Sequence, residues 1–108
     1  MPHLTFAGVK PEEIKEISTV LTDTLAEIAD APRDYFTYEV KENSFIFDGE
    51  IVNINPVIEV SWFDRGQHVK DEMASAIDQA FRRKGYDRIE IIFEPLEKES
   101  YFENAEHY

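Results

Sequence analysis

The pattern of hydrophobic and polar residues in the first half of the chain predicts a strand, a helix and a second strand. Apolar and polar residues alternate over residues 2–7, and aromatic and β-branched residues gather at residues 35–41, as is typical of strands. Pro11 suits the first turn of a helix between them, and the segment 30–32 ends that helix. The apolar residues of this helix recur at spacings of three and four: Ile14, Ile17, Leu21, Leu25 and Ile28.

The second half of the chain repeats this order after a hairpin. Residues 45–52 carry Asp48-Gly49 between two apolar runs, and Asp-Gly readily adopts the positive φ angles of a tight hairpin turn. A strand is predicted over residues 56–63 and another over residues 88–93. The helix between them carries one apolar stripe: Val69, Met73, Ala76, Ile77, Ala80 and Phe81.

Two β-α-β units joined by a hairpin predict an α+β fold, with a four-stranded mixed sheet and both helices on one face. The same order of elements also fits a ferredoxin-like fold, which stays open at this point. The face of the sheet without helices is expected to carry enough apolar side chains to pack against another copy of the chain. The aromatic residues of the acidic tail are also expected to pack on a neighbouring subunit: Tyr101, Phe102 and Tyr108.

Composition and charge narrow the class of protein. A length of 108 residues fits one domain spanning residues 1–108, and 43% hydrophobic residues are enough to form a core. With 11 basic and 23 acidic residues the net charge is −12, which argues against nucleic acid and anionic membranes as partners. No apolar run approaches the roughly 18 residues that cross a membrane, so the cytoplasm is the expected location.

Metal and thiol chemistry are not expected. The chain contains no cysteine, which excludes a disulfide framework, a thiol nucleophile and a thiolate metal site. His3, His68 and His107 show no metal-ligand spacing, so we expect neither a metal nor another cofactor. Candidate chemistry is therefore limited to the amino terminus and to a group of aromatic and basic residues near position 62.

Three short motifs connect this order of elements to a known class of protein. They are Pro2 directly after the initiator methionine, Lys-Pro-Glu-Glu at residues 10–13, and Asp-Ala-Pro at residues 30–32. With them the chain resembles the tautomerase superfamily over essentially its whole length. The opening at residues 2–4, the stretch 59–65 and the aromatic, acidic tail look most similar to its bacterial branch called domain of unknown function 1904. The resemblance implies a tautomerase-like pseudo-repeat that assembles as a homotrimer.

The resemblance implies that Pro2 is a catalytic base. Once Met1 is removed, Pro2 is a secondary amine at the chain end, and an apolar pocket near cations favours its neutral form. In the family such a proline takes a proton next to a carbonyl and returns it elsewhere, so we expect a cofactor-independent keto-enol tautomerase of a small 2-oxo or enol acid. If Met1 stays on the chain, Pro2 is an amide and cannot act this way. The alternative is that Pro2 only begins an edge strand, where a missing N–H is harmless.

Two basic residues are candidates for binding the substrate carboxylate by resemblance. Lys10 falls where family members have a substrate-binding arginine. The second such arginine falls on Thr37, and Arg33, four residues earlier, is the candidate to replace it. Arg33 also fits a plain role as a solvated surface residue.

A second group combines aromatic residues with a cation. In a weak internal repeat, Arg65 is the approximate partner of Lys10 and lies at the mouth of the second helix, where it is suited to bind an anion. Trp62 and Phe63 are candidates to line the pocket and exclude water. Trp62 equally fits the core or a subunit interface. A non-catalytic structural or ligand-binding protein on the same scaffold is the alternative to an enzyme.

Overall fold

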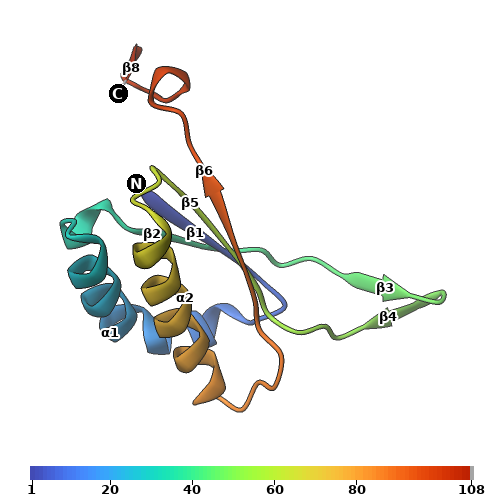
Figure 1. Cartoon of the computed structure of the whole chain (residues 1–108). Coiled ribbons are helices and arrows are strands. Elements are labelled where there is room, and N and C mark those ends of the chain that lie inside the picture. The colour runs from blue at the N-terminus through green and yellow to red at the C-terminus, as the bar shows by residue number, and fades with distance from the viewer. Residues whose placement is uncertain (108) are drawn as a thin grey trace.

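The computed structural model describes residues 1–107, with one central sheet, two helices packed against it and two projecting hairpins (Figure 1). The sheet is built from four strands: β1 (Pro2–Ala7), β2 (Thr37–Val40), β5 (Val57–Trp62) and β6 (Glu90–Pro95). The helices are α1 (Pro11–Ala29) and α2 (Gln67–Arg82), and the short 3₁₀ turns are η1 (Arg33–Tyr35) and η2 (Lys98–Ser100). The hairpins pair β3 (Phe45–Phe47) with β4 (Glu50–Val52) and β7 (Phe102–Glu103) with β8 (Glu106–His107).

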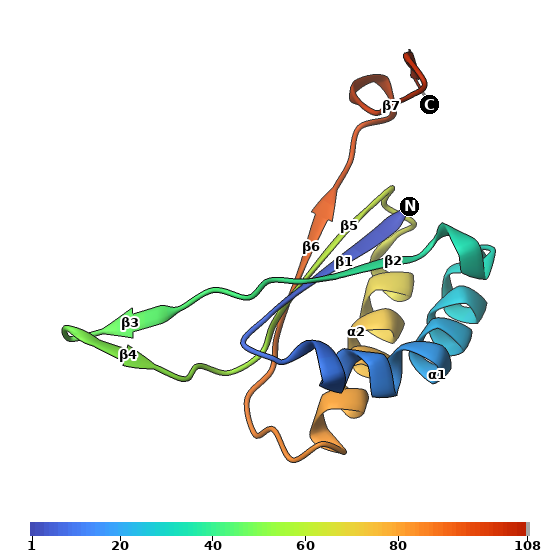
Figure 2. The same ribbon diagram turned by 180° about the vertical axis from the view of Figure 1, so that it is seen from behind.

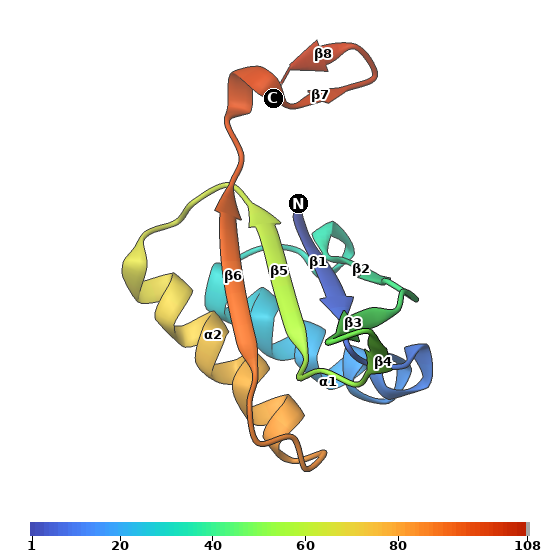
Figure 3. The ribbon, with the colours of Figure 1, turned by 90° about the vertical axis from the view of Figure 1, so that its right-hand side faces the viewer.

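The strand order of the sheet is β2-β1-β5-β6, with β1 parallel to β2, β5 parallel to β6 and the two central strands antiparallel. Each helix therefore joins two adjacent strands, and both helices cover the same face of the sheet (Figure 3). This arrangement confirms the predicted α+β tautomerase-like fold. The ferredoxin-like alternative is wrong, because a split β-α-β unit places another strand between the two strands that a helix joins.

Two strand boundaries differ from the predictions near prolines. The predicted strand 35–41 begins only at Thr37, because the segment after Pro32 first forms the η1 turn. The predicted strand 88–93 instead ends at Pro95. An edge strand such as β6 tolerates a proline, since the missing N–H is not needed for pairing on its outer side.

The core lies between the sheet and the helices. Along β1 and β5 every second side chain is fully buried, as their alternating patterns predict. Phe6 lies between the layers, with its ring centre 5.5 Å from that of Tyr38. The helices supply the opposing apolar side chains: Ile14, Leu21, Leu25, Met73, Ile77 and Phe81. This burial fixes the register of β1, because a slip by one residue would turn all its apolar side chains to the open face.

The open face of the sheet is polar, which corrects the expectation of an apolar surface. Because the alternate residues of β1 are buried in the core, His3 and Thr5 lie on the open face. The ring of His3 hydrogen-bonds there to the Thr37 hydroxyl at 2.5 Å and to the Glu39 carboxylate at 2.9 Å. The two strands beyond β1 add further polar side chains: Glu59, Ser61, Glu90 and Glu94. Within residues 1–107 the apolar side chains on this face are Ala7, Val57 and Ile92, too few to form a continuous apolar surface.

The β3–β4 hairpin carries apolar residues outside the core. Asp48 and Gly49 turn it with φ angles of 51° and 79°, as their sequence predicts. The hairpin extends away from the body of the molecule (Figure 2), and Ile46, Phe47 and Ile51 on it are 71%, 74% and 77% exposed. These side chains are a surface that a single chain leaves uncovered.

The tail forms the second hairpin, β7–β8, which the hydrophobic pattern does not predict. Tyr101 packs edge-on against Phe63 of its own chain, with ring centres 5.4 Å apart. Tyr101 therefore has a packing partner in its own chain, whereas the expectation was that it packs on a neighbouring subunit. Phe102 is 60% exposed, and Tyr108 lies outside the described residues.

We expect Gly8→Ala to destabilise the protein more than Gly49→Ala. The two glycines have φ angles of 78° and 79°, so an alanine is strained at either position. At Gly8 a Cβ atom would also lie 2.7 Å from the backbone oxygen of Asn55, whereas at Gly49 no described atom beyond the two adjacent residues lies within 4 Å. Urea titration should show a loss of about 1 kcal/mol for Gly49→Ala and about 2–3 kcal/mol for Gly8→Ala. Equal losses would show that the close approach of Asn55 has no energetic weight.

Candidate functional site

Strand register places Pro2 beside Trp62 at one end of the sheet. β1 begins at Pro2 and β5 ends at Trp62, and their antiparallel pairing puts these two residues opposite each other. Both side chains are less than 2% exposed. Phe63 and Arg65 follow directly in the loop after β5, so the structure brings together four of the predicted site residues. We call Pro2, Trp62, Phe63 and Arg65 the proline site.

Arg65 supplies the positive charge of the proline site. Its guanidinium carbon lies 5.6 Å from the centre of the Trp62 ring, and its Nη1 donates a hydrogen bond to the Phe63 carbonyl at 3.0 Å. The side chain is half-buried, and no carboxylate of residues 1–107 forms an ion pair with it. The other N–H groups of the guanidinium are therefore available to an anion.

Burial and charge both act on the amino terminus beside this site. Burial lowers the pKa of the Met1 ammonium group below its ordinary value, and the positive charge of Arg65 lowers that pKa further. Glu103 acts in the opposite direction. Burial disfavours any charged group, and a nearby cation disfavours an ammonium in particular. An amine at this end of the chain is therefore easier to deprotonate than an amine in water.

Trp62 has its ring in the core, and its N–H group has no hydrogen-bond acceptor in the described part of the chain. Its ring is fully buried and packs on Phe93, with ring centres 5.2 Å apart. Its Nε1 is buried without a hydrogen-bond partner among residues 1–107. Leaving a buried N–H without an acceptor is destabilising by about 1–3 kcal/mol. Packing in the core thus accounts for the ring of Trp62 and leaves its N–H group unexplained.

Two predicted residues lie apart from the proline site. Lys10 follows the far end of β1 and begins α1, so the length of the strand separates it from Pro2. Arg33 lies at the same end of the sheet as Pro2, because the η1 turn precedes the parallel strand β2. Its guanidinium is held by α1, through an ion pair with Asp23 at 2.7 Å and a hydrogen bond to the Thr19 carbonyl at 3.2 Å. A single chain therefore brings neither charge into the proline site.

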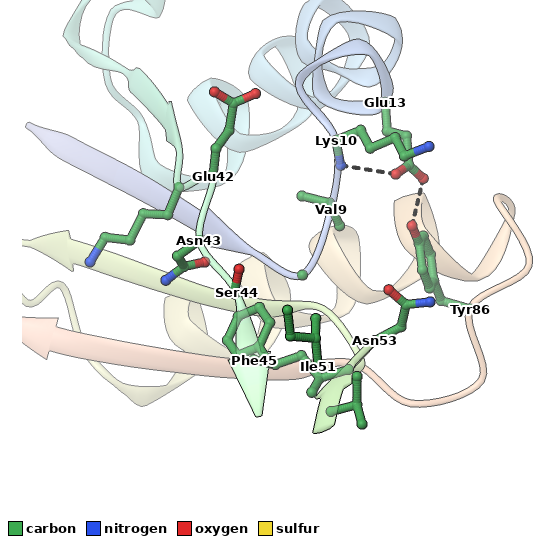
Figure 4. Close-up of a pocket in the computed structure, with 14 residues that line it drawn as sticks. Val9, Lys10, Glu13, Glu42, Asn43, Ser44, Phe45, Ile51, Asn53 and Tyr86 are labelled. Atoms are coloured by element: carbon green, nitrogen blue, oxygen red, sulfur yellow. Dashed lines mark hydrogen bonds between the residues drawn. The ribbon is translucent and has the colours of Figure 1, made fainter. Parts of the chain in front are cut away.

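A cavity of about 450 Å³ that the sequence does not predict lies at the other end of the sheet. It lies beneath the base of the β3–β4 hairpin, between the β1–α1 loop and Tyr86 (Figure 4). Apolar side chains and two lysines line it: Val9, Phe45, Ile51, Lys10 and Lys41. No residue of the proline site lines this cavity. Its lining comes from segments far apart in the sequence, so local patterns carry no signal for it.

A hydrogen-bonded pair lines one side of this cavity. The Glu13 carboxylate accepts hydrogen bonds from the Lys10 backbone N–H at 3.0 Å and from the Tyr86 hydroxyl at 2.6 Å (Figure 4). Burial acts to raise the pKa of Glu13, but the hydrogen bonds and the nearby lysines outweigh it and hold that pKa below its ordinary value. Burial, together with the Glu13 carboxylate, raises the pKa of Tyr86 to about 12. At neutral pH the pair is an ionised carboxylate bound to a neutral phenol.

Within residues 1–107, no three histidine or carboxylate side chains are grouped so that they could hold a metal ion. No helix in the described part of the chain combines the length and the apolar character needed to cross a membrane.

The fold is shared with solved structures of one structural class. A macrophage migration inhibitory factor-like protein from Entamoeba histolytica matches 99% of this chain and 98% of its own, at 17% identity and a TM-score of 0.73. A fused 4-OT symmetric trimer matches 90% of this chain and 87% of its own, at 20% identity and a TM-score of 0.71. The fold is therefore that of the tautomerase superfamily, as the resemblance predicts.

The chain belongs to the family described as domain of unknown function DUF1904, whose profile matches residues 1–107. The crystal structure of a DUF1904 domain from Sebaldella termitidis is 33% identical, with 100% of both chains covered and a TM-score of 0.95. A protein of unknown function from Vibrio cholerae is 28% identical over 99% of this chain and 87% of its own, with a TM-score of 0.86. No curated protein matches the sequence.

We expect Tyr86→Phe to destabilise the protein by about 1 kcal/mol at neutral pH, because it removes a hydrogen bond to an ionised carboxylate. Folding lowers the pKa of Glu13, so this stabilisation is present above the unfolded-state pKa of 4.5 and is lost as pH falls through the lower folded-state value. Folding raises the pKa of Tyr86, so the protein loses stability a second time as the pH rises from 10.0 to about 12.

Urea titrations at neutral and at acid pH check this expectation. The difference in unfolding free energy between wild type and Tyr86→Phe should shrink at acid pH. Tyr35→Phe is the control, because Tyr35 is 45% exposed. Its effect on stability should be small and independent of pH, and a pH-independent effect of Tyr86→Phe would contradict the role of Glu13.

Proposed function

We propose that residues 1–108 form one tautomerase-like domain that interconverts the keto and enol forms of a small 2-oxo acid without a cofactor, with Pro2 as the general base. The position of Pro2 carries this proposal: it is buried opposite Trp62, and the guanidinium of Arg65 lies over the Trp62 ring. A sheltered amine beside a cation suits a 2-oxo acid, because the cation binds the carboxylate while the amine takes a proton from the carbon next to the carbonyl. The proposal requires removal of Met1, because the nitrogen of Pro2 is otherwise an amide.

In this mechanism the substrate carboxylate binds Arg65, and the carbon next to the carbonyl lies at the Pro2 nitrogen. The neutral amine takes a proton from that carbon, the C–H electron pair forms the carbon–carbon double bond, and the carbonyl oxygen receives the negative charge. The protonated proline then gives its proton to this oxygen, which yields the enol and restores the amine. Ketonisation is the reverse sequence, so the reaction consumes no oxidant or reductant.

Short-range effects favour a neutral amine. The net charge of −12 acts to raise the pKa of an amine, but salt screens charges beyond about 10 Å. Burial and Arg65 lower the pKa of the terminal ammonium at close range. Once Met1 is removed, the amine belongs to Pro2 itself, whose ring is buried opposite Trp62. These effects support Pro2 as a base near neutral pH.

Assembly would supply the second cation of the site. Lys10 and Pro2 lie at opposite ends of β1 in one chain, so Lys10 reaches a proline site only from a second copy. We therefore propose a homotrimer in which each Lys10 serves a neighbouring copy. The fused 4-OT that shares this fold is a symmetric trimer, and the exposed β3–β4 hairpin offers apolar surface for a subunit contact. Sedimentation equilibrium tests the assembly, and a stable monomer would exclude this role for Lys10.

A non-catalytic ligand-binding protein on the same scaffold is the second candidate. The cavity of about 450 Å³ favours it, because its apolar walls, two lysines and two glutamates suit a small molecule that carries both charged and apolar groups, while Pro2 lies elsewhere. In that case Pro2 only begins β1. The two functions are separable by experiment, since only the enzyme needs the Pro2 nitrogen.

We expect the protein to accelerate ketonisation of the enol form of phenylpyruvate, followed by absorbance. Pro2→Ala should lower kcat/KM about 100-fold or more, the usual contribution of a general base. Alanine also permits removal of the initiator methionine, so intact-mass measurement should show loss of Met1 from both proteins. A retained Met1 in the wild type would exclude the proline base, and equal rates for the two proteins would favour the ligand-binding alternative.

We expect Arg65→Gln to raise the KM for the acid and to move the acid limb of the pH–rate profile to higher pH. The variant removes a charge that lowers the pKa of the amine, so the amine stays protonated to a higher pH. A loss of about 10- to 100-fold in kcat/KM is expected at neutral pH from the missing charge-assisted contact. Arg33→Gln is the matched control, since Asp23 already pairs with Arg33. The same profile change in both variants would contradict the role of Arg65.

A further inference from the structure

The chain beyond β6 is tied to the proline site at two points. The Leu96 N–H donates a hydrogen bond to the Trp62 carbonyl at 2.7 Å, and Tyr101 packs edge-on against Phe63 at 5.4 Å. The β7–β8 hairpin then stands beyond the amino terminus, at the end of the sheet where Pro2 lies (Figure 1 and Figure 3). The segment that leads from β6 to the hairpin is therefore anchored on Trp62 and Phe63 of the proline site.

Glu103 brings a negative charge to this hairpin. It is the last residue of β7, its side chain is exposed, and it forms no ion pair with another residue of the described chain. Its charge reaches the amino terminus, where it opposes the effect of Arg65 on the pKa of the ammonium group. The amino terminus thus has a cation from the loop after β5 and a carboxylate from the hairpin.

We propose that Glu103 is a specificity-determining residue of the proline site, and that it favours acids with one carboxylate over acids with two. This inference rests on the function proposed above. The proposal places the reacting carboxylate on Arg65, the reacting carbon at Pro2 and the rest of the substrate on the side of the hairpin, which stands beyond the amino terminus. A second carboxylate at the distal end of the substrate would lie near Glu103, and like charges at short distance repel.

The surroundings of Glu103 favour an uncharged distal group in the same way. Residues 94–108 contain five glutamates and one lysine, so the tail as a whole repels a second negative charge. Phe63 and Tyr101 form an aromatic contact at the base of the hairpin, with ring centres 5.4 Å apart. An aromatic distal group gains apolar contact there, whereas a carboxylate gains none.

Two acids that differ by one distal carboxylate test the proposal: phenylpyruvate and 4-carboxyphenylpyruvate. Calorimetric titration at low ionic strength gives the ratio of their dissociation constants for wild type, Glu103→Gln and Glu106→Gln. Glu106 is the matched control, since it is the cross-strand partner of Glu103 in the same hairpin and carries the same charge. We expect wild type to prefer the monoacid and Glu103→Gln to reduce that preference about threefold to fivefold, as for two like charges near water. Glu106→Gln should change the ratio less than Glu103→Gln, because Glu103 is the carboxylate whose charge acts on the amino terminus.

Each outcome bears on one of the two proposals. An unchanged ratio in Glu103→Gln, an equal change in Glu106→Gln, or no binding of either acid to wild type would overturn the role of Glu103. Salt gives a further check, because the wild-type preference should weaken at high ionic strength if it is electrostatic. Binding with the expected ratios but without turnover would leave the role of Glu103 intact and remove the tautomerase function. Turnover with a ratio of dissociation constants that does not change in Glu103→Gln would support the tautomerase function and overturn the role of Glu103.

Discussion

The antiparallel pairing of β1 with β5 is the contact on which the rest of the structure depends. It joins two β-α-β units into one sheet, and without it each unit would leave a strand edge open. Burial of Leu4 and Phe6 fixes the register, because a shift by one residue would expose both. The same register sets Pro2 opposite Trp62. The stability of the core and the geometry of the proline site therefore come from a single constraint.

The elements that could be predicted are those whose signal is local. The apolar stripe from Ile14 to Ile28 spans most of α1, and Asp48-Gly49 marks the turn between β3 and β4. The β7–β8 hairpin could not be predicted in this way, because strands of two residues show no period. Its turn uses Asn104-Ala105 at positive φ and lacks the glycine that usually marks such a turn.

The candidate site was predictable in its residue types but less so in its geometry. Residue chemistry and the family resemblance pointed to Pro2 and Arg65, and strand register brings them to one end of the sheet. Lys10 could not be placed from residue type alone, because β1 carries it to the opposite end. The polar open face was predictable: the side chains of His3 and Glu59 fall out of phase with the buried positions of their strands. The expectation of an apolar face failed because it counted apolar residues without this alternation.

Trp62 also gives the protein a spectroscopic property. It is the only tryptophan in the chain, its indole is fully buried, and the guanidinium of Arg65 lies over the ring. Indole emission responds to nearby charge and to hydration, and no second indole contributes background. Intrinsic fluorescence therefore reports on one end of one sheet, and the protein carries its own optical probe beside the guanidinium of Arg65.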